Sequence, residues 1–247
     1  MKYIRYPELE NQVAVVTGGT RGIGLAISEA FCQNGMLVMA VYRAKNEEAE
    51  KAVVEFRDKY SFRAIRCDVT ANNFKTMICS YLALLGISEV NVLVNNAGIV
   101  HRGKIINSEM APMRAVFETN VLGAINAVQA LAPFMKNNLR QKSIINIGST
   151  RGHDHYAIQN SGIYGASKAA LIHLTKTMAF ELAPMRVNSV SPDRTRTTLT
   201  TDSNLIAELI DINNPSDIAN MVLFLVSNAA RTITGKDIMV GSSIRPK

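Results

Sequence analysis

The chain has 247 residues, of which 47% are hydrophobic and 19% charged, and this composition excludes an intrinsically disordered protein. The formal net charge is +7, but lysine and arginine are spread along the chain without the basic runs and interleaved aromatic residues that are typical of nucleic-acid binding. We therefore expect no nucleic-acid partner and attribute the charge to a phosphorylated ligand or an acidic partner protein.

Short apolar runs rich in branched residues alternate with longer helical patterns. The predicted strands cover residues 13–17, 37–41, 62–67, 91–96, 143–149, 186–191 and 237–240. The predicted helices cover residues 22–34, 46–60, 72–86, 111–138, 164–183 and 215–228. Because the strand runs are apolar throughout, helices are expected on both faces of the sheet. This order predicts a single α/β domain over residues 1–247, with a doubly wound parallel sheet flanked by helices.

A glycine-rich turn follows the first predicted strand, where TGGTRGIG places Gly18, Gly22 and Gly24 before the first helix. The spacing TGxxxGxG is neither GxGxxG nor a P-loop, which needs a following Gly-Lys-Ser/Thr. Glycines there allow a tight turn, close approach of the backbone, and a helix N-terminus aimed at a pyrophosphate. Glycines can also simply end a strand, but at this place in an α/β chain they predict a Rossmann-type dinucleotide site.

The end of the second predicted strand indicates which dinucleotide would bind. An NAD site has an acidic residue there for the ribose hydroxyl, whereas an NADP site has cations for the 2′-phosphate. Here Arg43 and Lys45 follow the strand with no acid before Glu47, and Arg21 in the glycine loop can reach the same phosphate. Arginine offers a planar donor fork that suits phosphate. These residues predict NADP(H), against the alternative that they are solvated surface cations.

Tyr164 and Lys168 stand four residues apart at the start of a predicted helix, so they are neighbours on its surface. A free tyrosine has a pKa of about 10, and a nearby cation such as Lys168 is expected to lower that pKa. A tyrosine tuned in this way can protonate the alkoxide that forms when hydride reaches a ketone. Ser149, at the end of a predicted strand, would hydrogen-bond the carbonyl oxygen. A purely structural Tyr–Lys pair is the alternative.

Further motifs occur in a fixed order along the chain. They are TGGTRGIG (17–24), CDVT (67–70), NNAG (95–98), FETNVLG (117–123), INIGS (145–149), YGASK (164–168), RVNSVSP (186–192) and PSDIANMVLFLVS (215–227). With these motifs, the chain resembles the short-chain dehydrogenase/reductase family from about residue 11 to 240, and within it most closely the 3-oxoacyl-(acyl-carrier-protein) reductases. The resemblance implies an NADPH-dependent oxidoreductase that reduces a small ketone or a β-ketoacyl thioester to a secondary alcohol.

The resemblance also implies roles for single residues. The implied catalytic tetrad is Asn120, Ser149, Tyr164 and Lys168. In it, Asn120 holds a water linked to Lys168, and Lys168 also holds the nicotinamide ribose. The expected cofactor contacts are Thr17, Gly18, Thr20, Arg21, Gly22, Ile23, Gly24, Arg43, Asp68, Val69, Asn96, Ala97, Gly98, Tyr164, Lys168, Pro192 and Thr197. The expected substrate contacts are Ser149, Tyr164 and, at the substrate mouth, His153 and His155. The two imidazoles lack a third one nearby, so no metal is expected.

Some segments depart from the family pattern on the substrate side. Asp193 stands where the family has glycine after the proline, and it could weaken cofactor binding or pair with Arg194 or Arg196. The loop 197–215 is short, and the C-terminal tail is altered. Two alternatives to the ketoacyl reductase therefore stay open. One is a dedicated biosynthetic ketone reductase or secondary-alcohol dehydrogenase, and the other is a catalytically weak NADP-binding regulator.

Partners and location are predicted from charge, apolar faces and cysteines. Lys136, Arg140 and Lys142 could meet an acidic acyl carrier protein, or could simply be a solvated helix end. The apolar faces of helices 111–138 and 164–183 would suit a homo-oligomer, either a tetramer or a dimer. The N-terminus lacks the apolar run of a signal peptide, no run is long enough to span a membrane, and the three cysteines lack zinc or CxxC spacing. We expect a cytoplasmic protein without membrane contact.

Overall fold

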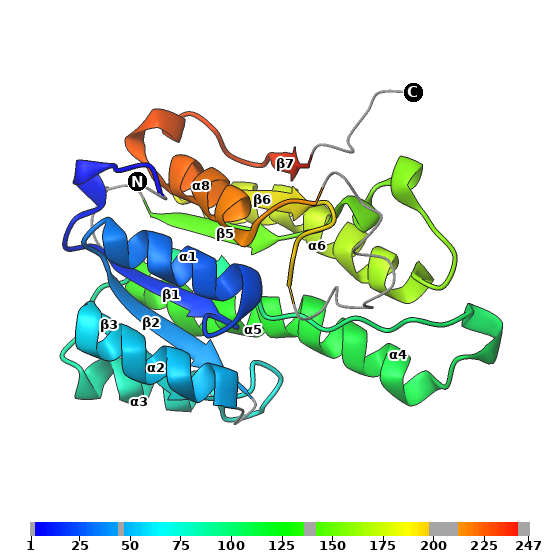
Figure 1. The fold of residues 1–247 in the computed structure, drawn as a ribbon, viewed down its shortest axis with the longest axis horizontal. Coiled ribbons are helices and arrows are strands. Elements are labelled where there is room, and N and C mark those ends of the chain that lie inside the picture. The colour runs from blue at the N-terminus through cyan, green and yellow to red at the C-terminus, as the bar shows by residue number, and fades with distance from the viewer. Residues whose placement is uncertain (1–2, 44–46, 136–141, 198–211, 242–247) are drawn as a thin grey trace.

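The computed structural model describes residues 3–43, 47–135, 142–197 and 212–241. Its strands are β1 Val13–Thr17, β2 Leu37–Tyr42, β3 Phe62–Arg66, β4 Val92–Asn95, β5 Ser143–Ile147, β6 Arg186–Pro192 and β7 Asp237–Val240. They form one sheet in the order β3-β2-β1-β4-β5-β6-β7, and every neighbouring pair is parallel (Figure 1). The chain builds β1, β2 and β3 in one direction and then crosses back to place β4 on the other side of β1. The strand order therefore reverses between β1 and β4. In such sheets, the crevice at the carboxyl ends of these strands is where ligands bind.

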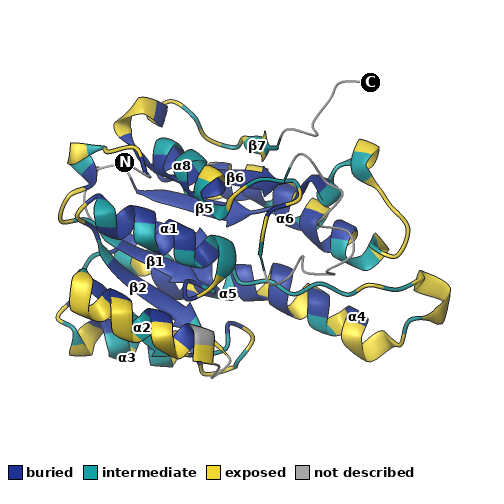
Figure 2. Cartoon of the chain, viewed as in Figure 1, coloured by how far each residue is buried: buried dark blue, intermediate teal, exposed yellow. Residues whose placement is uncertain are grey.

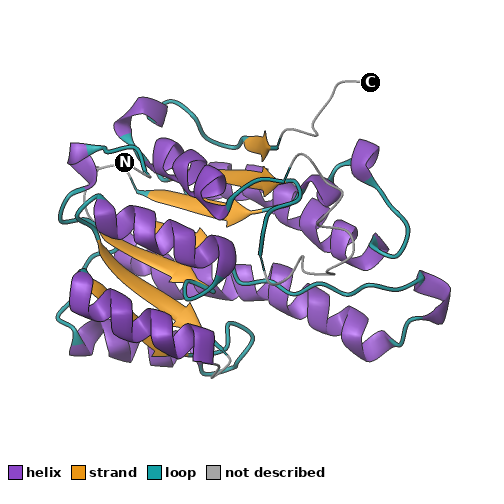
Figure 3. Ribbon diagram, viewed as in Figure 1, coloured by secondary structure: helices purple, strands orange, loops and turns teal. Residues whose placement is uncertain are grey.

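Helices cover both faces of this sheet (Figure 3). The α-helices are α1 Gly22–Gln33, α2 Glu47–Lys59, α3 Phe74–Leu84, α4 Met110–Phe117, α5 Gly123–Leu131, α6 Gly162–Glu181 and α8 Pro215–Val226. Short 3-10 turns are Pro7–Leu9, Ile105–Asn107, Ala132–Met135, Thr150–Gly152, Asp154–Tyr156 and Asn228–Ala230. Among the described helices, none is both long and apolar enough to cross a membrane.

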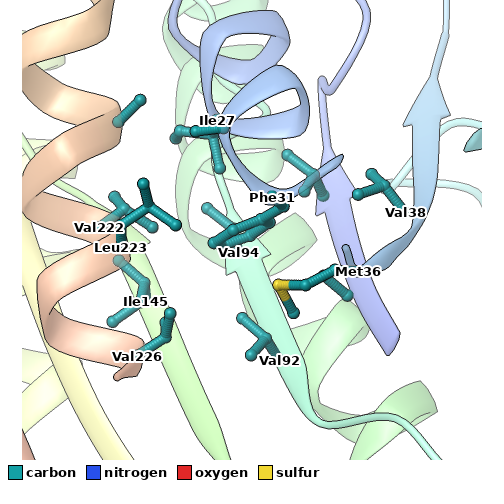
Figure 4. Close-up of a cluster of buried hydrophobic side chains, with 14 of the residues drawn as sticks. Ile27, Phe31, Met36, Val38, Val92, Val94, Ile145, Val222, Leu223 and Val226 are labelled. Atoms are coloured by element: carbon teal, nitrogen blue, oxygen red, sulfur yellow. The ribbon is translucent and has the colours of Figure 1, made fainter. Parts of the chain in front are cut away.

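Two hydrophobic clusters, one on each face, hold the layers together. Successive residues of β1 alternate between them, because Ala14 and Val16 point into one cluster and Val15 into the other. The first cluster joins the sheet to α1 and α8, and Figure 4 shows Ile27 and Phe31 of α1 beside side chains of α8. The second joins it to α3, α5 and α6. The central strands are buried on both faces, which explains their unbroken apolar sequences (Figure 2).

The seven predicted strands are confirmed to within two residues, but the long predicted helix 111–138 is wrong as one element. It divides into α4, a π-helical turn Glu118–Leu122, α5 and the 3-10 turn Ala132–Met135, while residues 136–138 lie outside the described part of the chain. The π-helical turn contains Asn120, whose side chain forms hydrogen bonds with the backbone of Ile99 in the segment after β4. A π-bulge is a local departure that periodicity cannot indicate, and such turns are frequent at functional sites.

Candidate active site

A cavity of about 680 Å³ opens where β1, β2, β4, β5 and β6 end. The predicted site residues that line it are Gly18, Thr20, Arg21, Gly22, Ile23, Arg43, Asp68, Val69, Asn96, Ala97, Gly98, Ser149, Tyr164, Lys168, Pro192 and Thr197. These residues come from segments far apart in the sequence, and the parallel sheet brings them together because all its carboxyl ends lie along one edge.

The glycine loop after β1 is held by the segment after β4. The side-chain nitrogen of Asn96 donates to the carbonyl oxygens of Thr17 (2.9 Å) and Gly18 (3.1 Å). The Thr17 hydroxyl accepts from the backbone nitrogens of Asn96 and Ala97, each at 3.0 Å. A Cβ atom on Gly24 would lie 2.1 Å from the Gly18 carbonyl oxygen, so only glycine fits there. Thr17 and Gly24, two of the predicted cofactor contacts, therefore stabilise the glycine loop and do not line the cavity.

This loop presents the N-terminus of α1 toward the cavity. Helix α1 begins at Gly22, and its N-cap residue Arg21 makes no side-chain capping bond. Backbone N–H groups at such a helix end are free to bind an anion, and the helix dipole favours one there. Gly18 has a φ of +65°, which allows the tight turn that exposes these groups. The geometry fits a pyrophosphate.

Two cations stand at the adenosine end expected for a dinucleotide. Arg21 and Arg43 both line the cavity, and the Arg43 side chain is 58% exposed. A guanidinium nitrogen of Arg43 lies 3.8 Å from a carboxylate oxygen of Asp68, whose other oxygen accepts from the backbone and hydroxyl of Thr70. The predicted Lys45 lies outside the described residues. The pair of arginines has the donors that a 2′-phosphate needs.

The predicted catalytic residues Ser149, Tyr164 and Lys168 gather at the other end of the cavity. Ser149 follows β5, and its hydroxyl is hydrogen-bonded to Tyr164, which lies in the first turn of α6. Lys168 is one turn further along α6, and its amine donates to the Ile147 carbonyl oxygen at 2.7 Å and lies 5.9 Å from the centre of the Tyr164 ring. The helical spacing of four residues thus places the two side chains together, as the sequence predicts.

Asn120 lies behind these groups and is not among the residues that line the cavity. Its side-chain nitrogen donates to the Ile99 carbonyl oxygen and to the Ser167 hydroxyl, both at 3.0 Å, and its oxygen accepts from the Ile99 backbone nitrogen at 2.8 Å. These bonds join the π-helical turn to the segment after β4 and to α6. Asn120 therefore fixes α6 to that segment.

The expected effect of Lys168 on Tyr164 is wrong for this structure. Burial raises the pKa of Tyr164 above its ordinary value, and a hydrogen bond from Ser149 and the charge of Arg151 lower it only in part. Burial also lowers the pKa of Lys168 from 10.5 to about 8. Tyr164 is thus protonated at neutral pH, and the cation whose charge acts on it is Arg151, which the sequence did not indicate.

The two histidines expected at the substrate mouth lie elsewhere. His153 places its Nε2 atom 2.9 Å from the Asp237 carboxylate, and His155 is exposed; neither lines the cavity. Arg102, Arg151 and residues 158–161 line the substrate end in their place. The sequence signal that could have indicated Arg151 is its position, because it is a charged residue only two positions after Ser149. Among the described residues, no cluster of three or more His, Cys, Asp or Glu could hold a metal.

Two predicted charge interactions also differ. The Asp193 carboxylate accepts a hydrogen bond from the Thr150 hydroxyl at 3.2 Å, in place of an ion pair with Arg194 or Arg196. Lys142 is buried, 4% exposed, and forms an ion pair with Glu89. Lys142 is thus unavailable to a partner protein, and the other two cations of that predicted patch, residues 136 and 140, lie outside the described residues.

Comparisons with known proteins show which family the chain resembles. The family model for short chain dehydrogenase matches residues 12–206. A 3α-hydroxysteroid dehydrogenase of Mediterraneibacter gnavus is 31% identical over 96% of this chain and 98% of its own. The 3-oxoacyl-(acyl-carrier-protein) reductase FabG of Staphylococcus epidermidis is 36% identical over 95% of this chain and 99% of its own. A crystal structure of a Burkholderia cenocepacia short chain dehydrogenase in complex with NADP has a TM-score of 0.84, 28% identity, and coverage of 94% and 97%.

The chain therefore belongs to the short chain dehydrogenase family. It is an oxidoreductase acting on CH–OH or C=O groups.

Proposed function

We propose that this protein uses NADPH to reduce a ketone to a secondary alcohol. The observation that carries the proposal is the Ser149–Tyr164–Lys168 group beside the glycine loop in one cavity. The uncapped N-terminus of α1 would hold the pyrophosphate of the cofactor, and Arg21 and Arg43 would hold the 2′-phosphate. NADPH supplies the hydride when bound. The structure of a Burkholderia relative with NADP supports this choice of cofactor.

The protein's own residues would handle the carbonyl oxygen and the proton. Ser149 would hydrogen-bond the carbonyl oxygen, where negative charge develops as hydride arrives at the carbon. Tyr164, neutral at physiological pH because its pKa is raised, would give its phenolic proton to that oxygen. The charge of Arg151 would favour the resulting phenolate, Lys168 would hold the nicotinamide ribose, and the bonds made by Asn120 would keep α6 in register with the cavity. One proton is consumed for each alcohol formed.

A β-ketoacyl thioester on an acyl carrier protein is the first substrate to test. The 36% identity to a 3-oxoacyl-(acyl-carrier-protein) reductase supports it. The second candidate is a free ketone reduced by a dedicated reductase. The burial of Lys142 favours this second candidate, since it removes one of three cations expected to meet a carrier. Cytoplasmic location, a single domain and a homo-oligomer remain our further predictions.

The test is NADPH oxidation by the purified protein with a β-ketoacyl thioester and a panel of ketones. Tyr164→Phe should lower turnover by a factor of about 10² to 10⁴ while NADPH still binds, because the variant lacks only the transferable proton. Wild-type protein that binds NADPH but turns over no ketone would instead support the regulator alternative.

Cofactor choice is tested separately by titrating NADPH and NADH into wild type and Arg43→Ala. NADPH affinity should fall by about tenfold and NADH affinity should change little, because only NADPH carries the 2′-phosphate. An equal loss for both cofactors would contradict a phosphate-binding role for Arg43.

A further inference from the structure

Arg151 is a cation held beside the reacting groups. It lies in the 3-10 turn Thr150–Gly152, and it lines the cavity together with Ser149 and Tyr164. Its backbone nitrogen donates to the Ser149 hydroxyl oxygen at 3.2 Å, which ties its position to the residue that would meet the carbonyl. One guanidinium nitrogen donates to the Tyr156 carbonyl oxygen at 3.0 Å, which orients the side chain. The guanidinium keeps further N–H donors for another ligand.

The charge of Arg151 has no carboxylate partner within the described part of the chain. No described Asp or Glu lies within 4.0 Å of its guanidinium. The carboxylates that line the same cavity are Asp68 and Asp193, and their oxygens already accept from Thr70 and Thr150. Arg151 is nevertheless close enough to Tyr164 for its charge to act on the phenol. A partly buried guanidinium without a counter-charge, next to the reacting groups, favours an anionic ligand.

Resting on the proposed ketone reduction, we propose that Arg151 is a specificity-determining residue that binds a carboxylate placed α or β to the substrate's carbonyl. The preferred substrates are then oxo acids, reduced to hydroxy acids. Hydride adds to the carbonyl carbon, the proton of Tyr164 adds to the oxygen, and the carboxylate is unchanged. A guanidinium binds a carboxylate through two parallel hydrogen bonds, whereas the carbonyl of a thioester or ester accepts only one and leaves the charge unmatched.

The experiment compares 3-oxobutanoate with its methyl ester, which keeps the ketone but lacks the charge. Wild type should show a higher kcat/KM for the acid. Arg151→Gln should lower the acid-to-ester ratio of kcat/KM by about 10- to 100-fold, mainly by raising KM for the acid. Any effect on Tyr164 is common to both substrates and cancels in the acid-to-ester ratio. Arg151→Lys, which keeps the charge, should restore part of that ratio, and Arg57→Gln on α2 is the control for removing a distant guanidinium.

Equal acid and ester values in wild type, or equal losses for both in Arg151→Gln, would overturn the proposal. A second measurement does not depend on turnover: calorimetric titration of 3-oxobutanoate into the protein–NADP⁺ complex. If wild type binds 3-oxobutanoate and Arg151→Gln does not, the carboxylate site is supported. This holds even when no ketone is reduced, and only the proposed ketone reduction is then wrong. Binding that is absent, or equal in both proteins, overturns the carboxylate site.

Discussion

The Nε2 atom of His153 lies 2.9 Å from a carboxylate oxygen of Asp237, so the loop that follows Ser149 is tied to the edge strand β7. The other oxygen of Asp237 accepts hydrogen bonds from the hydroxyls of Ser189 and Ser191 on β6. The Asp237 side chain is only 8% exposed. One buried carboxylate thus joins the last two strands to the loop that follows Ser149.

Replacing Asp237 should therefore cost more stability than replacing its histidine partner. Asp237→Ala leaves two buried hydroxyls and the imidazole without an acceptor, and we expect the free energy of unfolding to fall by about 2–4 kcal/mol. His153→Ala removes one bond at a more exposed position and should cost about 1 kcal/mol. Urea denaturation measures both. Asp237→Asn keeps one acceptor oxygen without the charge and should lie between them; equal losses in the two alanine variants would contradict the central role of Asp237.

A methyl group on Gly24 should disrupt the cofactor loop. In Gly24→Ala, the new Cβ would lie 2.1 Å from the Gly18 carbonyl oxygen and 2.4 Å from the Asn96 side-chain nitrogen. The loop must then move away from α1, and NADPH affinity should fall by more than about tenfold. Fluorescence titration of NADPH measures this loss.

The matched control is the same change at Gly86. This residue has a φ of +67° but no atom within 4 Å of its would-be Cβ, so Gly86→Ala should cost only about 1 kcal/mol of strain and leave NADPH binding intact. NADPH affinity at the wild-type level in Gly24→Ala would show that the loop tolerates the displacement.

The lowered pKa of Lys168 should appear in the pH dependence of stability. Between pH 8 and 10, the amine is largely neutral in the folded protein and protonated in the unfolded chain, since its pKa falls from 10.5 to about 8 on burial. The unfolded state then binds more protons, so stability rises with pH in this window. We expect a contribution of about 2 kcal/mol from pH 8 to 10. Tyr164 opposes this rise only near pH 10, because the unfolded tyrosine begins to ionise there while its raised pKa keeps the folded one protonated.

Lys168→Met lacks this titrating group and is the comparison. Denaturation at several pH values should give a steeper rise for wild type than for the variant across pH 8–10. Parallel curves would mean that Lys168 titrates near its ordinary pKa.

Because the buried Lys142 forms an ion pair with Glu89, we expect its replacement to lower the stability of the protein and to leave the binding of a partner protein unchanged. Lys142→Met leaves Glu89, which is 37% exposed, without its cation, and we expect the free energy of unfolding to fall by about 1–2 kcal/mol. KM for a carrier-bound substrate should stay the same. Lys75→Met on the surface of α3 is the control for charge removal, and a raised KM in Lys142→Met alone would restore the carrier-docking interpretation.

Much of this protein could be predicted from the sequence because its signals are local. Apolar runs such as 13–17 and 143–147 become central strands wherever both faces of a sheet are covered. The glycine spacing of the first turn and the four-residue step from Tyr164 to Lys168 are likewise contained in short segments, and backbone geometry alone relates their members.

Tertiary structure decided the charges and their partners. Nothing near Lys142 in the sequence indicates Glu89, and nothing near His153 indicates Asp237, because these pairs join segments that meet only after folding. The same holds for the π-helical turn at Asn120 and for Arg151 as the cation beside Tyr164. Burial sets the pKa of Tyr164 and Lys168, and burial depends on the whole packed chain around them.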